Sequence, residues 1–201
     1  MVWPIGLTVC DLPHTQRLLV HSEDGSSCVA LISWILGYPD RSLDEMRAAV
    51  RSAETLGDPF TLAQTLCFAA LVHIVRHEPS AAADYAGRAL KICEERRIAQ
   101  WQAWGLCERG WSLGVSGESD KGVAQIGQGV DGYVGALQHV LLTLQADAQL
   151  AIGKPEAALA SVAAGLGAVG VPSKLGHHPA WFGVQSRGER RRDDDIAVVA
   201  H

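Results

Sequence analysis

The segment Gly37-Tyr-Pro-Asp40 decides the fold, because three similar segments follow it at nearly constant steps. They begin at residues 77, 117 and 153, which gives steps of 40, 40 and 36 residues. They read His77-Glu-Pro-Ser80, Gly117-Glu-Ser-Asp120 and Gly153-Lys-Pro-Glu156. Self-similarity at a period of about 20 to 50 residues is typical of proteins built from stacked supersecondary units. Each segment therefore marks the turn of one repeat.

Small residues recur at fixed distances from each turn, and we call these twelve places the crossing positions. Seven residues before the first turn residue lie Ala30, Ala70, Gly110 and Ala146. Five residues after it lie Ser42, Ala82, Gly122 and Ala158. Twelve residues after it lie Ala49, Ala89, Gly129 and Gly165, and an aliphatic residue follows each: Val50, Leu90, Val130 and Leu166. Helices need small side chains where their backbones cross closely, so the repeat is predicted to be a helical hairpin.

Prolines divide the chain into helices. Pro39, Pro79 and Pro155 fit the first turn of a second helix, where a missing N–H costs nothing, and Asp58-Pro59 opens the next hairpin. The sequence shows neither sustained alternation nor a two-residue hairpin link, so no strand is expected. The pattern predicts four hairpins, with helices at 26–36, 40–56, 59–76, 79–96, 99–116, 120–136, 138–152 and 155–168. We expect an irregular segment at 1–23, a repeat domain at 24–170 and an irregular, disordered tail at 171–201.

Composition narrows the class of protein. With 48% hydrophobic and 19% charged residues among 201, the chain is too apolar for disorder and too interrupted by polar residues for a membrane protein. A formal charge of -5 provides no basic field for nucleic acid. Five scattered cysteines without CxxC spacing indicate reduced core thiols. The first residues, Met1 to Asp11, lack a basic region, so the sequence predicts a cytoplasmic protein that binds neither membrane nor nucleic acid.

Several strings resemble one family. The crossing positions match the tetratricopeptide consensus in spacing, although that repeat has about 34 residues and its large aromatic positions are poorly kept here. In order, the following strings resemble the C-terminal repeat region of bacterial signalling proteins that join a class III adenylate or guanylate cyclase to an ATPase: WILGYPD (34–40), LGDPF (56–60), WQAW (101–104), RGWSL (109–113) and GKPEAAL (153–159). The resemblance covers roughly residues 24–170. It implies an all-α fold: a right-handed superhelical array of antiparallel helix hairpins, or TPR-like α-solenoid, with no sheet.

The resemblance implies a binding groove. In such arrays, ligands lie against the first helix of each hairpin. Trp104 and Trp111 lie two turns apart on one helical face, so two interpretations stay open: contact with a partner, or packing against the neighbouring hairpin. A protein or peptide partner would be held by Leu31, Trp34, Cys67, Leu71, Ile74, Trp104, Cys107, Trp111 and Asp147.

Catalytic and metal-binding patterns are weak in this sequence. It contains no phosphate loop of the GxxxxGK[ST] type, no GxSxG and no HExxH. The pair Cys10 and His14 and the pair His177-His178 lack further ligands at zinc-finger spacing. His73 and His77 stand four residues apart, and surface or capping roles are expected for them. We therefore predict no enzymatic activity, no cofactor and no metal.

The function that fits these expectations is a non-catalytic interaction or regulatory module, a scaffold that holds a protein or peptide. The Ala- and Gly-rich stretch from Ala157 to Ala168 lacks a polar cap, which favours a homo-oligomer. An alternative stays open, in which the chain is a truncated fragment of a cyclase or ATPase signalling protein that has lost its catalytic domains.

Overall fold

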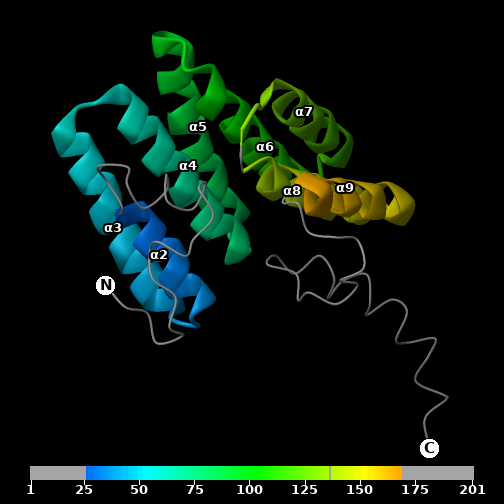
Figure 1. Ribbon diagram of the computed structural model, residues 1–201, viewed down its shortest axis with the longest axis horizontal. Coiled ribbons are helices and arrows are strands. Elements are labelled where there is room, and N and C mark those ends of the chain that lie inside the picture. Colours follow the sequence, from blue (N-terminus) through cyan, green and yellow to red (C-terminus); the bar gives the residue numbers. More distant parts are fainter. Residues whose placement is uncertain (1–25, 136, 169–201) are drawn as a thin grey trace, which may run out of the picture.

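The computed structural model describes residues 26–135 and 137–168. These ranges contain eight helices and no strand, so the all-helical prediction is confirmed for them (Figure 1). The predicted segments 1–23 and 171–201 lie outside the described residues. The helices are α2 (Ser26–Ile35), α3 (Pro39–Leu56), α4 (Pro59–Val75), α5 (Pro79–Arg96), α6 (Ala99–Val115), α7 (Ser119–Gly132), α8 (Gln138–Ala151) and α9 (Pro155–Ala168).

The four predicted turns share one backbone geometry. The first residue of each has a positive φ: 86° at Gly37, 57° at His77, 101° at Gly117 and 73° at Gly153. The next residue donates its N–H to the carbonyl five residues earlier, which is the bond of the Schellman helix end. All four of these bonds measure 2.9 Å and join Tyr38 to Ser33, Glu78 to His73, Glu118 to Leu113, and Lys154 to Gln149. The turn that was read from the sequence is therefore a repeated structural unit.

Prolines and one cap fix where the helices begin. Pro39, Pro59, Pro79 and Pro155 are the first residues of α3, α4, α5 and α9. The sequence predicted these starts for α4, α5 and α9, and it placed the start of α3 one residue later, at residue 40. At the start of α4, the Asp58 carboxylate accepts a hydrogen bond of 2.7 Å from the Thr61 N–H. This bond satisfies one of the free donors of the first turn. Hydrogen bonding to Thr61 also lowers the pKa of Asp58.

The crossing positions close each hairpin. All twelve are buried. In the hairpin of α6 and α7 the backbones approach closely, because a Cβ added at Gly110 would lie 2.7 Å from the backbone oxygen of Gly122. Helices α2 with α3, α4 with α5, α6 with α7, and α8 with α9 therefore pack as antiparallel pairs.

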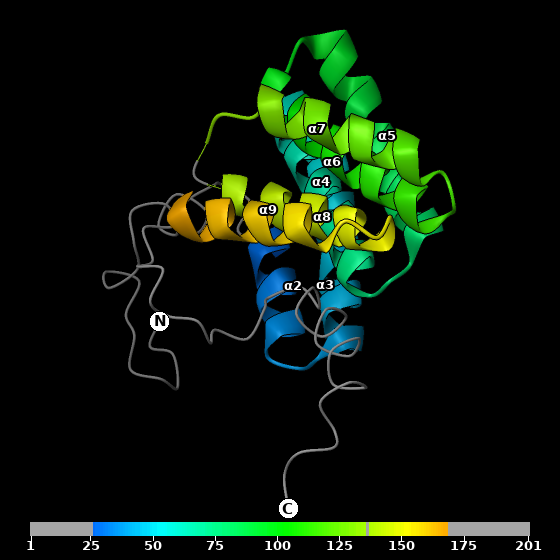
Figure 2. The same cartoon turned by 90° about the vertical axis from the view of Figure 1, so that its right-hand side faces the viewer.

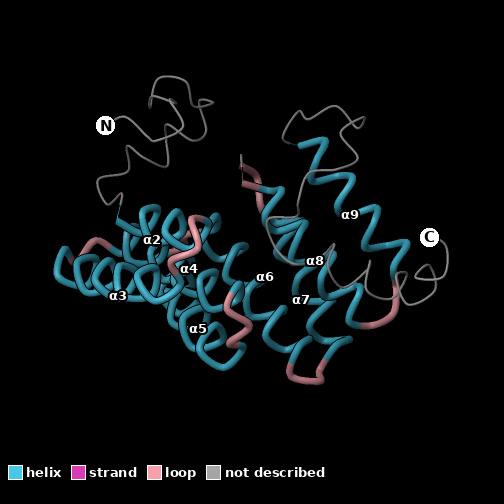
Figure 3. Tube along the Cα trace, turned by 90° about the horizontal axis from the view of Figure 1, so that it is seen from below, coloured by secondary structure: helices cyan, strands magenta, loops and turns pink. Residues whose placement is uncertain are grey.

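Neighbouring hairpins share one core. Successive first helices pack on each other, α2 on α4, α4 on α6 and α6 on α8, while α3, α5 and α7 each pack against the first helix that follows. Figure 2 shows α8 and α9 lying across the side of the molecule, and Figure 3 shows the hairpins following one another from α2 to α9. One cluster of buried hydrophobic residues extends from Ala30 in α2 to Ala148 in α8.

One predicted boundary is wrong. The sequence predicted a helix at 120–136, but α7 ends at Gly132 because Tyr133 turns to an extended backbone, with φ -92° and ψ 126°. Tyr133 is 3% exposed and its ring lies edge-on to Trp104, with the ring centroids 5.8 Å apart. Burying this ring stabilises the fold by more than another turn of a glycine-rich helix would.

Candidate functional site

The structure divides the nine predicted groove residues into two groups. Only Leu31, Trp34 and Asp147 keep part of their surface exposed. A side chain without exposed surface cannot touch a partner in this conformation. Of the two interpretations of Trp104 and Trp111, the structure therefore favours packing against the neighbouring hairpin. The six buried residues are Cys67, Leu71, Ile74, Trp104, Cys107 and Trp111.

Five rings form a cluster that joins α4, α6 and the link after α7. Its members, which we call the aromatic cluster, are Phe60, Phe68, Trp101, Trp104 and Tyr133. Neighbouring centroids lie between 5.7 and 6.2 Å apart, mostly in edge-to-face geometry. Such pairs contribute about 0.5–1.5 kcal/mol each beyond the area they bury. The cluster therefore holds the second and third hairpins together.

Two of the predicted groove residues meet directly. The Trp111 indole N–H donates a hydrogen bond of 2.6 Å to the Asp147 carboxylate, which links α6 to α8. The Trp111 ring also lies 6.3 Å from the His77 ring of the preceding turn. Trp111 thus connects three hairpins.

A buried carboxyl group that the sequence analysis missed lies beside the aromatic cluster. Glu108 is fully buried, and its Oε1 accepts a hydrogen bond of 2.8 Å from the Trp104 indole N–H, while its Oε2 has no hydrogen-bond partner. Burial raises the pKa of Glu108 well above its ordinary value, although the hydrogen bond from Trp104 and the nearby Cys67 thiol act in the opposite direction. Burial therefore favours the protonated form of this acid over its carboxylate. The sequence contains a signal for the burial of Glu108. It lies nine residues before its turn, and at the same place the other hairpins carry Cys28, Phe68 and Leu144.

The described cysteines are reduced, as predicted: Cys67, Cys93 and Cys107 are buried and Cys28 is partly buried. Burial raises the pKa of the Cys67 and Cys107 thiols, with the Glu108 carboxyl adding to the effect, and raises that of Cys93 to about 11. These three thiols are protonated at neutral pH and do not act as nucleophiles. Among residues 26–135 and 137–168, no group of three or more His, Cys, Asp or Glu side chains is placed to hold a metal ion.

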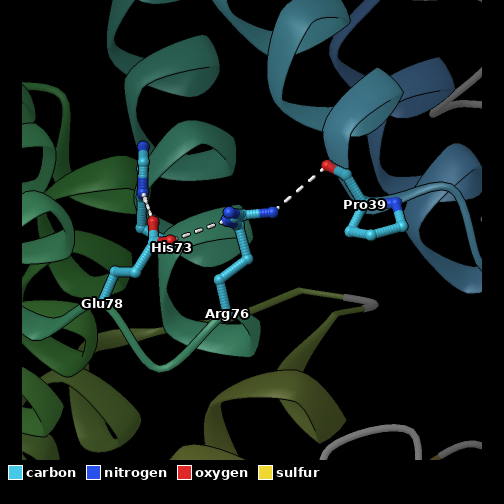
Figure 4. Close-up of polar contacts among 4 residues, drawn as sticks. All are labelled: Pro39, His73, Arg76 and Glu78. Atoms are coloured by element: carbon cyan, nitrogen blue, oxygen red, sulfur yellow. Dashed lines mark hydrogen bonds and ion pairs between the residues drawn. The ribbon is translucent and has the colours of Figure 1, made fainter.

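A polar network ties the second turn to the first hairpin. Glu78 lies between the His73 ring nitrogen Nδ1, at 2.6 Å, and the Arg76 Nε, at 2.9 Å (Figure 4). Arg76 also donates a hydrogen bond of 3.3 Å to the carbonyl of Pro39 at the start of α3. Burial raises the pKa of Glu78, but the hydrogen bonds with His73 and Arg76 lower it by more, so the pKa lies below its ordinary value. The expected surface role for His73 is wrong, because its side chain is buried and bound to Glu78, whereas His77 is exposed.

A second polar group lies on the outer surface of α5. The Tyr85 ring stacks on His73 with centroids 5.2 Å apart, and the Arg88 guanidinium lies 5.5 Å from the Tyr85 centroid. Arg88 also forms an ion pair of 2.5 Å with Glu54 of α3. Tyr85 and Arg88 line a shallow surface depression with Ala81 and Asp84. Tyr and Arg are common at protein interfaces, but Arg88 is already paired within the chain.

Comparison with known proteins finds no relative. No protein-family model, no curated protein and no solved structure matches the chain. None of the described helices combines the length and the apolar character that crossing a membrane requires.

Proposed function

We propose that this chain is a non-catalytic protein-binding or regulatory module, in which the hairpins form a right-handed TPR-like α-solenoid. The observation that carries the proposal is the fourfold recurrence of one turn, with the same positive φ and the same 2.9 Å hydrogen bond each time. Stacked hairpins of this kind present extended surfaces along the array, which suit peptides and partner domains.

The contact surface that we propose is the accessible part of the predicted groove. Among the described tryptophans, Trp34 alone keeps exposed surface, while Trp101, Trp104 and Trp111 are buried. Trp side chains are strong interface anchors. Leu31 lies three residues before Trp34 on the same helix, so both side chains lie on one side of α2. We propose a protein or peptide partner at this position, in the cytoplasm.

The likeness to cyclase–ATPase repeat regions rests on the sequence strings alone. On that likeness, the chain is alternatively a fragment of such a signalling protein without its catalytic domains. In both cases the chain binds and does not turn over nucleotide, so ATP or GTP hydrolysis by the purified chain would contradict both proposals.

The test is site-specific photo-crosslinking in bacterial cells. A photoreactive amino acid replaces Trp34 in one variant and Leu56 in the control; Leu56 is exposed apolar surface at the end of α3. We expect one discrete protein adduct, identified by mass spectrometry, from position 34 and none from position 56. No adduct at position 34, or the same adducts at both positions, would contradict a partner-binding surface on α2.

A further inference from the structure

Glu108 lies where the third hairpin packs on the second. Helices α4 and α6 pack on each other, and the Trp104 ring of α6 lies edge-on to the Phe68 ring of α4, with centroids 6.0 Å apart. The Glu108 Oε1 accepts a hydrogen bond of 2.8 Å from Trp104, and the Cys67 thiol of α4 lies beside the carboxyl group. Two hairpins thus enclose this acid, and separating them would let water reach it.

The surroundings of Glu108 suit an uncharged acid. Its side chain is fully buried, its Oε2 has no hydrogen-bond partner, and it takes part in none of the ion pairs among the described residues. The titratable groups around it are thiols, and burial raises the pKa of each: Cys67 of α4, Cys107 of α6 itself, and Cys93 of α5 near Cys67.

The remaining helices packed on α6 do not compensate a charge on this acid. Neither α7 nor α8 contributes a described group that acts on the pKa of Glu108. A carboxylate that is buried without a positive charge or enough hydrogen-bond donors is unfavourable, whereas water hydrates it well. The ionised form of Glu108 is therefore more stable in water than between the two hairpins.

The chain can bend between these hairpins. Two residues, Arg97 and Ile98, link α5 to α6, and Arg97 has a left-handed φ of 56°. In stacked arrays each unit contacts its neighbours, so one contact between units can open while the helix pairs on both sides stay folded. We call the contact between the second and third hairpins the central joint.

We propose that the central joint is a pH-sensitive switch, in which Glu108 gives up its proton to water when the joint opens. Above the ordinary pKa of 4.5, the open form releases this proton and the closed form retains it. Rising pH therefore favours the open form, up to the raised pKa of the closed form, and acid favours the closed form. The aromatic cluster opposes opening, so the switch balances ring packing against hydration of one carboxylate.

This switch goes beyond the function proposed above, because it needs no partner. Opening exposes Cys67, Trp104 and Cys107, which are buried in the closed form. The sequence assigned all three to a partner surface, so the switch would also control access to them.

Thiol labelling of the full chain from about pH 5 to pH 8 tests the switch. Mass spectrometry follows Cys67 and Cys107 separately, at reagent concentrations where the rate is proportional to the reagent. Glu108→Gln is the matched control, because it keeps the shape and the acceptor for Trp104 but cannot ionise. Thiol ionisation in the open form is common to both proteins and cancels in the ratio of their rates.

We expect the labelling rate of the unmodified chain, divided by that of Glu108→Gln, to rise by up to about tenfold per pH unit. A difference in stability that does not depend on pH shifts this ratio without changing its slope. A ratio that stays constant with pH would overturn the proposal.

Glu108→Leu is a second variant without an ionisable group, and it takes the residue that Leu144 provides at the equivalent place of α8. It keeps the test decisive if Glu108→Gln does not fold, which circular dichroism establishes for each variant. Dividing by the rate of Glu108→Leu should give the same slope with pH. A flat ratio with this variant would equally overturn the proposal.

Labelling of the unmodified chain in low urea distinguishes an opening joint from unfolding of the whole chain. A local opening exposes less surface than complete unfolding, so its equilibrium responds less steeply to urea. We expect the labelling rate of Cys67 to rise less steeply with urea than the unfolding equilibrium that circular dichroism measures. Equal slopes would mean that Cys67 reacts only through complete unfolding, which would overturn the proposal.

Discussion

Hairpins α4–α5 and α6–α7 share one turn geometry and differ in how closely their helices approach. The crossing positions are alanines in α4–α5 and glycines in α6–α7. Ala82 of α5 is fully buried with its Cβ in place. At the equivalent Gly122, a Cβ would lie 2.5 Å from the backbone oxygen of Gly110 and 2.7 Å from the backbone nitrogen of Gly114. The repeat therefore fixes where two helices cross, while the residue at the crossing fixes their spacing.

The two hairpins also differ at the core position nine residues before the turn. Phe68 of α4 packs its ring against Trp101 and Trp104, with centroids 5.7 and 6.0 Å away. Glu108 of α6 occupies the equivalent place as a buried acid bonded to Trp104. In these two hairpins the same position of the repeat thus holds an apolar ring in one and a buried carboxyl group in the other, and the carboxyl group adds a dependence of stability on pH.

The largest expected effect on stability comes from adding a side chain at a glycine where α6 and α7 cross. Gly122→Ala forces backbone atoms of α6 and α7 apart, and we expect it to lower the free energy of unfolding by about 3 kcal/mol. Gly127→Ala on the same helix is the control. A Cβ there meets nothing within 4 Å, so this change should stabilise the protein by about 0.5–1 kcal/mol. Urea denaturation measures both values, and equal effects would contradict the close approach.

The second largest expected effect concerns how the stability of the fold depends on pH. The folded state raises the pKa of Glu108, so above the ordinary value of 4.5 the unfolded state releases a proton that the folded state keeps. The stability contributed by this group therefore falls as pH rises from about 4.5 toward the folded-state pKa. Glu108→Gln removes this dependence. We expect its melting temperature to exceed that of the unmodified chain by several degrees at pH 7 and to match it near pH 4.

A smaller effect is expected at the first crossing position of α3. Ser42 stands where the other hairpins have Ala82, Gly122 and Ala158, and its buried hydroxyl has no hydrogen-bond partner. Ser42→Ala removes that unsatisfied group and should stabilise the protein by about 1 kcal/mol. Thr55→Ala later on α3 is the comparison, because the Thr55 hydroxyl donates a hydrogen bond of 2.8 Å to the Arg51 carbonyl and is exposed. A stability gain at Thr55 as large as at Ser42 would contradict this explanation.

The smallest effect concerns the end of α5. Arg97 has φ 56° and follows α5 where Gly57, with φ 72°, follows α3. A non-glycine residue in this left-handed region is strained, so Arg97→Gly should stabilise the protein by about 1 kcal/mol or less. Arg96→Gly, one residue earlier and still helical, should instead destabilise it by a similar amount. Thermal melts of both variants check the opposite signs.

The turns and helices were predictable because their signals are local. Pro at a helix start and a small residue at a crossing act within one hairpin, so seven of the eight helix ends matched to within one residue. The end of α7 was not predictable in this way, because the burial of Tyr133 against Trp104 depends on a contact between hairpins.

The groove residues illustrate the same limit. Residues of α4 and α6 such as Cys67 and Trp104 were assigned to a binding surface, but each helix is covered by its neighbours in the described structure. Helical spacing identifies one face of a helix and does not say what covers it. Glu108 was detectable, because comparison of the repeats places an acid among Cys28, Phe68 and Leu144.

We propose that the hairpins form one module that folds without further protein. Circular dichroism with thermal melting of the full chain, beside the same chain cut at Ser173, is the test. We expect a strong helical signal and a cooperative melt that survives the cut, because the described core extends through α2 to α8. Weak helicity, or a broad and non-cooperative melt of either chain, would mean that the hairpins need further protein to fold, so the proposal would be wrong.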